Sequence, residues 1–79
     1  MSMSSKKAIF RLQRNEVGDC TIDLSVWRIF RHKWSTILDT PTHFTECMII
    51  IKEWCYNHDI NTAVVFDPDG VNKKMVINY

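Results

Sequence analysis

The segment from Thr40 to Asp59 constrains the fold most strongly, because its apolar residues recur with the period of an α-helix. At about 100° per residue, these apolar residues gather on one wide face. That face carries Phe44, Cys47, Met48, Ile50, Ile51, Trp54, Cys55 and His58. Thr40 is a good N-cap, Pro41 suits the first helical position, and residues 57–59 are typical of a helix end. We therefore predict one long helix over about residues 41–58.

The opposite face of the predicted helix is polar except for Ile49 and Tyr56. These two residues are two turns apart, so they lie on one line along the helix. Single apolar residues on a protein surface are common and need no function. The alternative interpretation is a contact patch for a partner chain, formed by Ile49 and Tyr56 with the neighbouring Lys52 and Glu53.

Two stretches before the helix alternate between apolar and polar residues, as half-buried strands do. Residues 7–13 form the first stretch and residues 20–26 the second. Residues 15–19 lie between them and include one of the two glycines in the chain, which indicates a hairpin turn. The apolar side of the first strand would consist of Ala8, Phe10 and Leu12.

Residues 26–38 are compatible with two structures. A helix would line up several apolar residues on one side, but the segment contains no Ala, Glu or Gln and is rich in β-branched and aromatic residues. Alternatively, the second strand continues to about Phe30, the chain turns at residues 31–33, and residues 34–38 form a third strand. That version needs a bulge at Val26–Trp27, where the alternation slips by one residue. Composition favours the strand version, and neither version decides whether the two tryptophans are buried.

The chain after the helix predicts a second hairpin. Residues 62–66 are rich in strand formers, the sequence DPDG at residues 67–70 is a strong turn signal, and residues 74–79 alternate again. The sum is a two-layer α+β fold, with a small antiparallel β-sheet of two hairpins and a further strand, and the long helix packed across one face. Residues 1–79 make one small domain, in which we expect residues 1–6 to be a disordered lead-in.

No set of residues predicts an enzyme, a cofactor site or a metal site. His43 with Cys47, and Cys55 with His58, have spacings that place two ligands on one helix face. At about 1.5 Å of rise per residue, however, the two pairs are too far apart to share an ion. We expect the cysteines to be small apolar core residues. We therefore predict no catalytic residue, no cofactor and no bound metal.

Composition indicates in which cellular compartment the protein is expected. Apolar residues make up 46% of the chain, which is enough for one core. No apolar run approaches the roughly 20 residues of a membrane span, and the N-terminus lacks the apolar segment of a signal peptide. Three cysteines without a CxxC spacing indicate reduced thiols. We expect a cytoplasmic protein with no membrane contact.

Charge is distributed unevenly along the chain, although the net charge is only +1. Residues 1–35 contain seven Lys/Arg and three Asp/Glu, whereas residues 36–79 contain three and six. Basic and aromatic residues alternate closely from Trp27 to Trp34. This mixture occurs in nucleic-acid-binding surfaces, and Trp and Arg are also enriched at the centres of protein–protein interfaces.

These observations predict a small non-enzymatic protein-binding module, an inhibitor or adaptor that occupies the surface of a partner protein. The predicted partner-binding residues are Arg28, Arg31, Lys33, Trp34, Ile49, Lys52, Glu53 and Tyr56. The alternative is a nucleic-acid-binding protein that uses the basic and aromatic N-terminal half. Two hairpins also leave open sheet edges, through which a homodimer can form.

Overall fold

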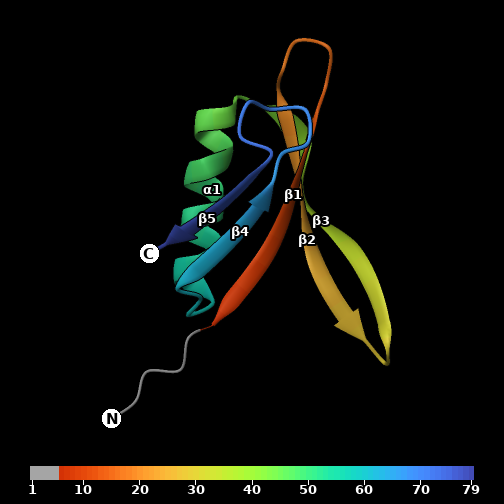
Figure 1. Ribbon diagram of the computed structural model, residues 1–79, viewed down its shortest axis with the longest axis vertical. Helices are drawn as coiled ribbons and strands as arrows, with labels where there is room; N and C mark the ends of the chain where they lie inside the picture. Colours follow the sequence, from red (N-terminus) through yellow and green to blue (C-terminus); the bar gives the residue numbers. More distant parts are fainter. Residues whose placement is uncertain (1–5) are drawn as a thin grey trace.

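The computed structural model describes residues 6–79 and shows one helix packed across one face of a β-sheet (Figure 1). The strands are β1 (Lys7–Arg14), β2 (Cys20–Arg28), β3 (Arg31–Thr42), β4 (Thr62–Phe66) and β5 (Lys74–Asn78), and the helix is α1 (Phe44–Asn57). The predicted two-layer α+β fold with a single long helix is therefore confirmed. No helix in residues 6–79 is long and apolar enough to cross a membrane.

The strands lie in the order β3-β2-β1-β4-β5, and the sheet is mixed. All neighbouring pairs are antiparallel except β1 and β4, which are parallel. The prediction of a purely antiparallel sheet was wrong at this pair. β3 runs in the same direction as β1, and the helix returns the chain to the end at which β1 begins. β4 therefore starts beside β1 and runs parallel to it, as strand–helix–strand crossovers require.

The core lies between α1 and the sheet face that it covers. Phe10 and Leu12 of β1 are fully buried there, as are Ile51 and Cys47 of α1. The ring of Phe10 meets Trp54 edge-to-face, with 5.5 Å between ring centroids. The predicted alternation of the first strand is confirmed, because Ala8, Phe10 and Leu12 are buried. The predicted apolar face of the helix packs against the core from Phe44 to Cys55, whereas His58, which was placed on that face, is exposed at the C-cap.

The helix begins three residues later than predicted. Thr40 and Pro41 belong to β3, and the N-cap is His43, whose Nδ1 accepts a hydrogen bond from the backbone N–H of Thr45 at 3.2 Å. β3 is an edge strand, where a proline is tolerated because one side of the strand has no neighbour. The pairing of Thr42 with Cys20 extends β3 past the proline and delays the helix start.

Residues 26–38 form two strands, but the turn lies earlier than predicted. Ile29 and Phe30 make the turn, and Arg28 pairs with Arg31. The bulge predicted at Val26–Trp27 is absent, and the register shifts instead on both sides of Ile22. The alternation slips at Trp27 for a different reason. β1 pairs with β2 only as far as Leu24, so the hairpin beyond that point has no buried face to impose a pattern.

Residues 1–5 of the predicted lead-in lie outside the described residues. Lys6, the last residue of that segment, is held by hydrogen bonds. Its backbone N–H donates to Asn61 Oδ1 at 3.1 Å, and its carbonyl oxygen accepts from the backbone N–H of Thr62 at 3.1 Å. These bonds fix the beginning of β1 to the beginning of β4.

Candidate functional site

The β2–β3 hairpin projects from the sheet as a two-stranded ribbon, and we call its residues 25–34 the arm (Figure 1). Within the arm, β2 and β3 pair only with each other. A two-stranded ribbon is marginally stable in water by itself. Its shape therefore depends on side-chain contacts between the arm and the sheet, and between the two strands of the arm.

The tip of the arm consists of Ile29 and Phe30, which are 91% and 100% exposed. Both residues have positive φ, 44° and 64°, as a two-residue turn of type I′ requires. Such turns are normally made by Asn-Gly or Asp-Gly, because positive φ is unfavourable for bulky and β-branched residues. Neither burial nor backbone preference accounts for these two side chains. They are the strongest candidates for contact with another molecule.

Neither tip residue was among the predicted partner-binding residues, because the turn was predicted at residues 31–33. Neither Ile29 nor Phe30 has the composition of a turn, so propensity gave no signal there. The available signal was the bracketing of this apolar pair by two arginines, Arg28 and Arg31.

Three aromatic side chains fasten the arm on its face away from the helix. His32 lies between Trp27 and Trp34, with ring centroids 5.3 Å and 5.0 Å away, and its Nε2 is 2.7 Å from the Ser25 hydroxyl. The guanidinium of Arg11 lies over the Trp34 ring, 4.4 Å from its centroid. Cross-strand contacts of this kind contribute about 0.2–1 kcal/mol each, so together they order the ribbon. Trp27 is exposed, and Trp34 is half-buried.

The cations of the arm lie on its other face. Arg28 pairs with Arg31 and Lys33 pairs with Val26, positions that alternate with the aromatic ones along each strand. The only ion pairs within residues 6–79 join Arg11 to Asp23 and Arg14 to Asp67. The three cations of the arm therefore have no carboxylate partner in the described part of the chain. Residues that alternate in sequence are thus separated in space into an aromatic face and a basic face.

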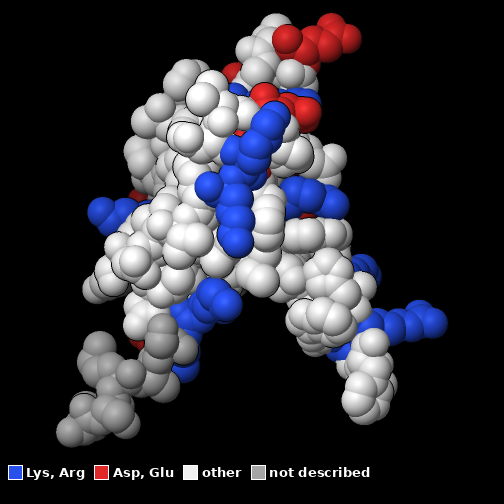
Figure 2. Space-filling model, in the orientation of Figure 1, with Lys and Arg blue, Asp and Glu red and all other residues white. Residues whose placement is uncertain are grey.

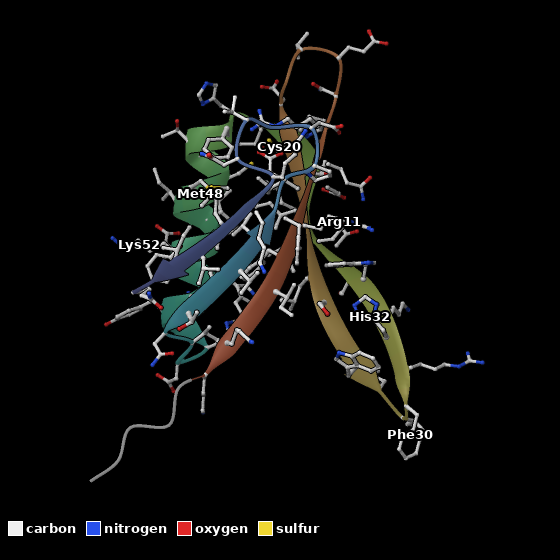
Figure 3. All side chains as sticks on the ribbon, in the orientation of Figure 1. Arg11, Cys20, Phe30, His32, Met48 and Lys52 are labelled. Atoms are coloured by element: carbon white, nitrogen blue, oxygen red, sulfur yellow. The ribbon has the colours of Figure 1, made fainter. Side chains whose placement is uncertain are left out.

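The structure brings the predicted helix residues together, but away from the arm. A hollow of about 470 Å³ lies on the outer side of α1. It is lined by the four predicted residues and by Asn57: Ile49, Lys52, Glu53, Tyr56 and Asn57. Ile49 is half exposed and Tyr56 is 84% exposed, as the sequence analysis predicted. Figure 3 shows Lys52 and Phe30 on opposite sides of the molecule. The predicted partner-binding residues therefore form two separate surfaces.

A third surface lies on the face of the sheet that α1 leaves uncovered. One row of residues crosses this face, with each residue paired to the next on the neighbouring strand. From β3 to β5 the row consists of Thr36, Asp23, Arg11, Phe66 and Lys74. Beside this row is a hollow of about 600 Å³, which we call the open-face hollow. It is lined by Arg11, Trp34, Phe66, Pro68, Lys73 and Lys74. This hollow could not be predicted from the sequence, because it forms only when β4 lies beside β1.

A buried carboxylate holds Arg11 in place on this face. Asp23 accepts hydrogen bonds from Arg11 Nη2 at 2.7 Å, Gln13 Nε2 at 2.5 Å and Thr36 Oγ1 at 2.9 Å. Burial by itself would raise the pKa of Asp23, but the hydrogen bonds from Arg11, Gln13 and Thr36 outweigh that effect and lower the pKa below its usual value. Asp23 therefore stays ionised and fixes the position of Arg11 over Trp34.

A second buried ion pair fixes the turn between β4 and β5. Arg14 donates to both carboxylate oxygens of Asp67, at 3.0 Å and 2.7 Å. Gly70 closes over this pair, and a Cβ atom there would lie only 2.1 Å from Asp67 Oδ2. The turn thereby sets the positions of Pro68 and Lys73 beside the open-face hollow.

The cysteines offer little nucleophilic chemistry. Cys20, Cys47 and Cys55 are buried and unbridged, and burial raises the pKa of Cys47 to about 11. A thiol with so high a pKa is protonated at neutral pH and is a poor nucleophile. Within residues 6–79, no three His, Cys, Asp or Glu side chains gather as a metal-binding group.

Comparison with known proteins gave no significant similarity to any family model, any curated protein or any solved structure.

Proposed function

We propose that the protein is a small non-enzymatic binding module that inserts the tip of its arm into an apolar cleft of a partner protein. By occupying that cleft it acts as an inhibitor or adaptor. The observation that supports this proposal most directly is the pair Ile29 and Phe30, which are almost completely exposed and have positive φ. A conformation that costs stability persists where another role favours it.

The tip has the properties of an anchor. Burying an Ile or Phe side chain is worth about 1.5–3 kcal/mol, and interface energy concentrates in a few such residues. The contacts of Trp27, His32 and Trp34 order the arm before binding, which reduces the entropy lost on association. A narrow ribbon with an apolar end fits into a cleft better than it fits against a flat surface.

The charges of the arm indicate the chemistry around that cleft. Arg28, Arg31 and Lys33 flank the tip and have no carboxylate partner in the described residues. We infer that carboxylates border the cleft of the partner, so that opposite charges meet at the rim of the interface. Association would then slow as salt concentration rises.

Nucleic acid is the alternative partner for the arm, and the absence of acidic residues from the arm favours it. The separation of the aromatic and basic faces argues for protein instead. Binding of a single strand needs bases and phosphates to meet rings and cations on the same side, whereas in the arm they project to opposite sides. We also propose a cytoplasmic location, which the three unbridged thiols support because a reducing compartment keeps cysteines free.

A double variant tests the arm without damaging the hairpin. Ile29→Asn with Phe30→Gly removes both apolar side chains and supplies the residues that a type I′ turn prefers. Tagged wild-type chain, this variant and a helix-face variant, Ile49→Asp with Tyr56→Ala, are used to capture partners from source-cell lysate. Parallel samples are treated with nuclease, and thermal unfolding confirms that all three chains fold.

The proposal expects a protein that wild type captures in the presence of nuclease, that the arm variant loses and that the helix-face variant retains. Retention by the arm variant together with loss by the helix-face variant would assign binding to the outer surface of α1. Loss of all capture after nuclease treatment would show that the arm holds no protein partner. Either of these two results would overturn the proposal.

A further inference from the structure

The open-face hollow is a second surface with properties that folding does not explain. Phe66 is 38% exposed there, on a strand whose other face is fully buried. Trp34 and Pro68 complete an apolar floor beside it. The contributing residues come from β1, β3, β4, β5 and the turn after β4, so the floor is assembled from several elements of the fold.

Cations surround this apolar floor. Lys74 Nζ lies 5.8 Å from the centre of the Phe66 ring, and Lys73 Nζ donates to the carbonyl oxygen of Pro68 at 2.8 Å. Neither lysine forms an ion pair within residues 6–79. Figure 2 shows Lys and Arg spread over this view of the molecule, while most of the visible Asp and Glu gather at its upper end. The hollow therefore suits a ligand that is both planar and anionic.

The same charges exclude one obvious occupant, the arm of a second copy. The arm carries Arg28, Arg31 and Lys33, so its approach to Lys73 and Lys74 would bring like charges together. An apolar ligand without charge would leave the lysines unused. A duplex is also a poor match, because its bases are already stacked inside and cannot reach the floor.

We propose that the open-face hollow binds single-stranded nucleic acid. An unstacked base lies on the ring of Phe66 beside Trp34, and the phosphates on either side approach Lys73 and Lys74. Arg11, held by Asp23, borders the same base with its guanidinium plane. Sheet faces that carry exposed aromatic residues and cations use this combination of stacking and phosphate pairing.

This site differs from the sequence-based expectation of a nucleic-acid surface. That expectation used the basic N-terminal half, which supplies Arg11 and Trp34 to the hollow, whereas Phe66, Lys73 and Lys74 come from the other half of the chain. Trp34 of the arm also lines the hollow, but neither of the tip residues, Ile29 and Phe30, does so. Failure of one proposal therefore leaves the other intact.

The test is fluorescence anisotropy of labelled oligo-dT and oligo-U of about 12 nucleotides, a length within the range that small sheet domains bind. The full chain is titrated at two salt concentrations, about 50 mM and 200 mM, because phosphate contacts weaken as salt rises. Phe66→Ala should weaken binding roughly tenfold through lost stacking. Lys73→Ala with Lys74→Ala should weaken binding and reduce its dependence on salt.

Tyr56→Ala with Lys52→Ala is the matched control, because it removes an aromatic ring and a cation from the outer side of α1. This control and the arm variant Ile29→Asn/Phe30→Gly should both bind as wild type does. The proposal is overturned if wild type does not bind at the lower salt concentration, or if Phe66→Ala and the control bind equally well. Equal competition by polyglutamate or by a duplex would show general attraction of polyanions and would also overturn it.

Discussion

The two turns that border β2 are built in opposite ways. In the turn before β2, Asn15 Oδ1 accepts from the backbone N–H groups of Val17 and Asp19, at 3.1 Å and 3.0 Å, and Gly18 takes φ 88°. In the turn after β2, Ile29 and Phe30 take positive φ, and no side-chain hydrogen bond supports them. The first turn uses residues that suit its backbone, whereas the second exposes two bulky side chains at positions whose φ disfavours them. The side chains of the first turn therefore stabilise the fold, whereas those of the second turn project from the arm without stabilising it.

Two phenylalanines show the same contrast between a residue that stabilises the fold and one that does not. The largest change in the free energy of unfolding is expected for this pair. Phe10 is fully buried between the sheet and Trp54, whereas Phe30 is fully exposed. Phe10→Ala should lower the free energy of unfolding by about 3–5 kcal/mol, the usual cost of removing a buried ring. Phe30→Ala should change it by less than about 0.5 kcal/mol, as expected for an exposed site. Urea unfolding of both variants measures the difference, and a substantial loss in Phe30→Ala would mean that the tip packs against the protein itself.

The second expected effect is an increase in stability. Ile29→Asn with Phe30→Gly should raise the free energy of unfolding by about 1–2 kcal/mol, because it relieves the cost of positive φ for bulky residues. Chemical denaturation of the double variant and wild type under the same conditions checks this prediction. An unchanged or lower stability would show that the tip conformation costs nothing, and would remove the main support for a binding role.

The third effect concerns the polar turn. Asn15→Ala removes the acceptor of two backbone N–H groups and should lower stability by about 1 kcal/mol. Asn15→Asp keeps that acceptor and is the matched control, which should stay close to wild type. Equal stability of all three chains would contradict the view that side-chain hydrogen bonds support this turn.

These contrasts also explain which parts of the structure followed from the sequence. The helix and the buried side of β1 were predictable because burial imposes a period on residues such as Phe10, Leu12 and Ile51. The arm lies beyond the last partner in β1, so no burial pattern marks it, and the turn at Ile29 contradicts turn propensity. Local sequence therefore predicted a hairpin but placed its turn wrongly.

The candidate sites depended on longer-range structure. The helix-face residues Ile49 and Tyr56 were found because a helix turns neighbours in sequence into neighbours in space. The open-face hollow instead joins Arg11 to Phe66 and Lys74 across a parallel pairing that only the helical connection produces. The basic and aromatic residues of the arm were recognised, but their division between two faces required the register of β2 and β3.

A further expected effect depends on pH and lies where the arm leaves the sheet. Asp23 pairs with Thr36 immediately before the arm begins, and its pKa is lowered in the folded protein. A carboxylate with a lowered folded-state pKa stabilises the fold above its ordinary pKa of about 4, and that contribution is lost as pH falls further. Asp23→Asn should therefore be less stable than wild type at neutral pH, and the two should converge as the solution becomes acidic.

Free energies of unfolding measured in urea between neutral and acidic pH test this dependence on Asp23. Glu16→Gln is the control, since Glu16 is exposed in the polar turn and forms no ion pair within residues 6–79. The difference between wild type and Asp23→Asn should shrink with acid, while the difference for the control stays small throughout. A constant difference at all pH values would mean that Asp23 acts through its shape and neutral hydrogen bonds, and that its charge does not hold Arg11 at the base of the arm.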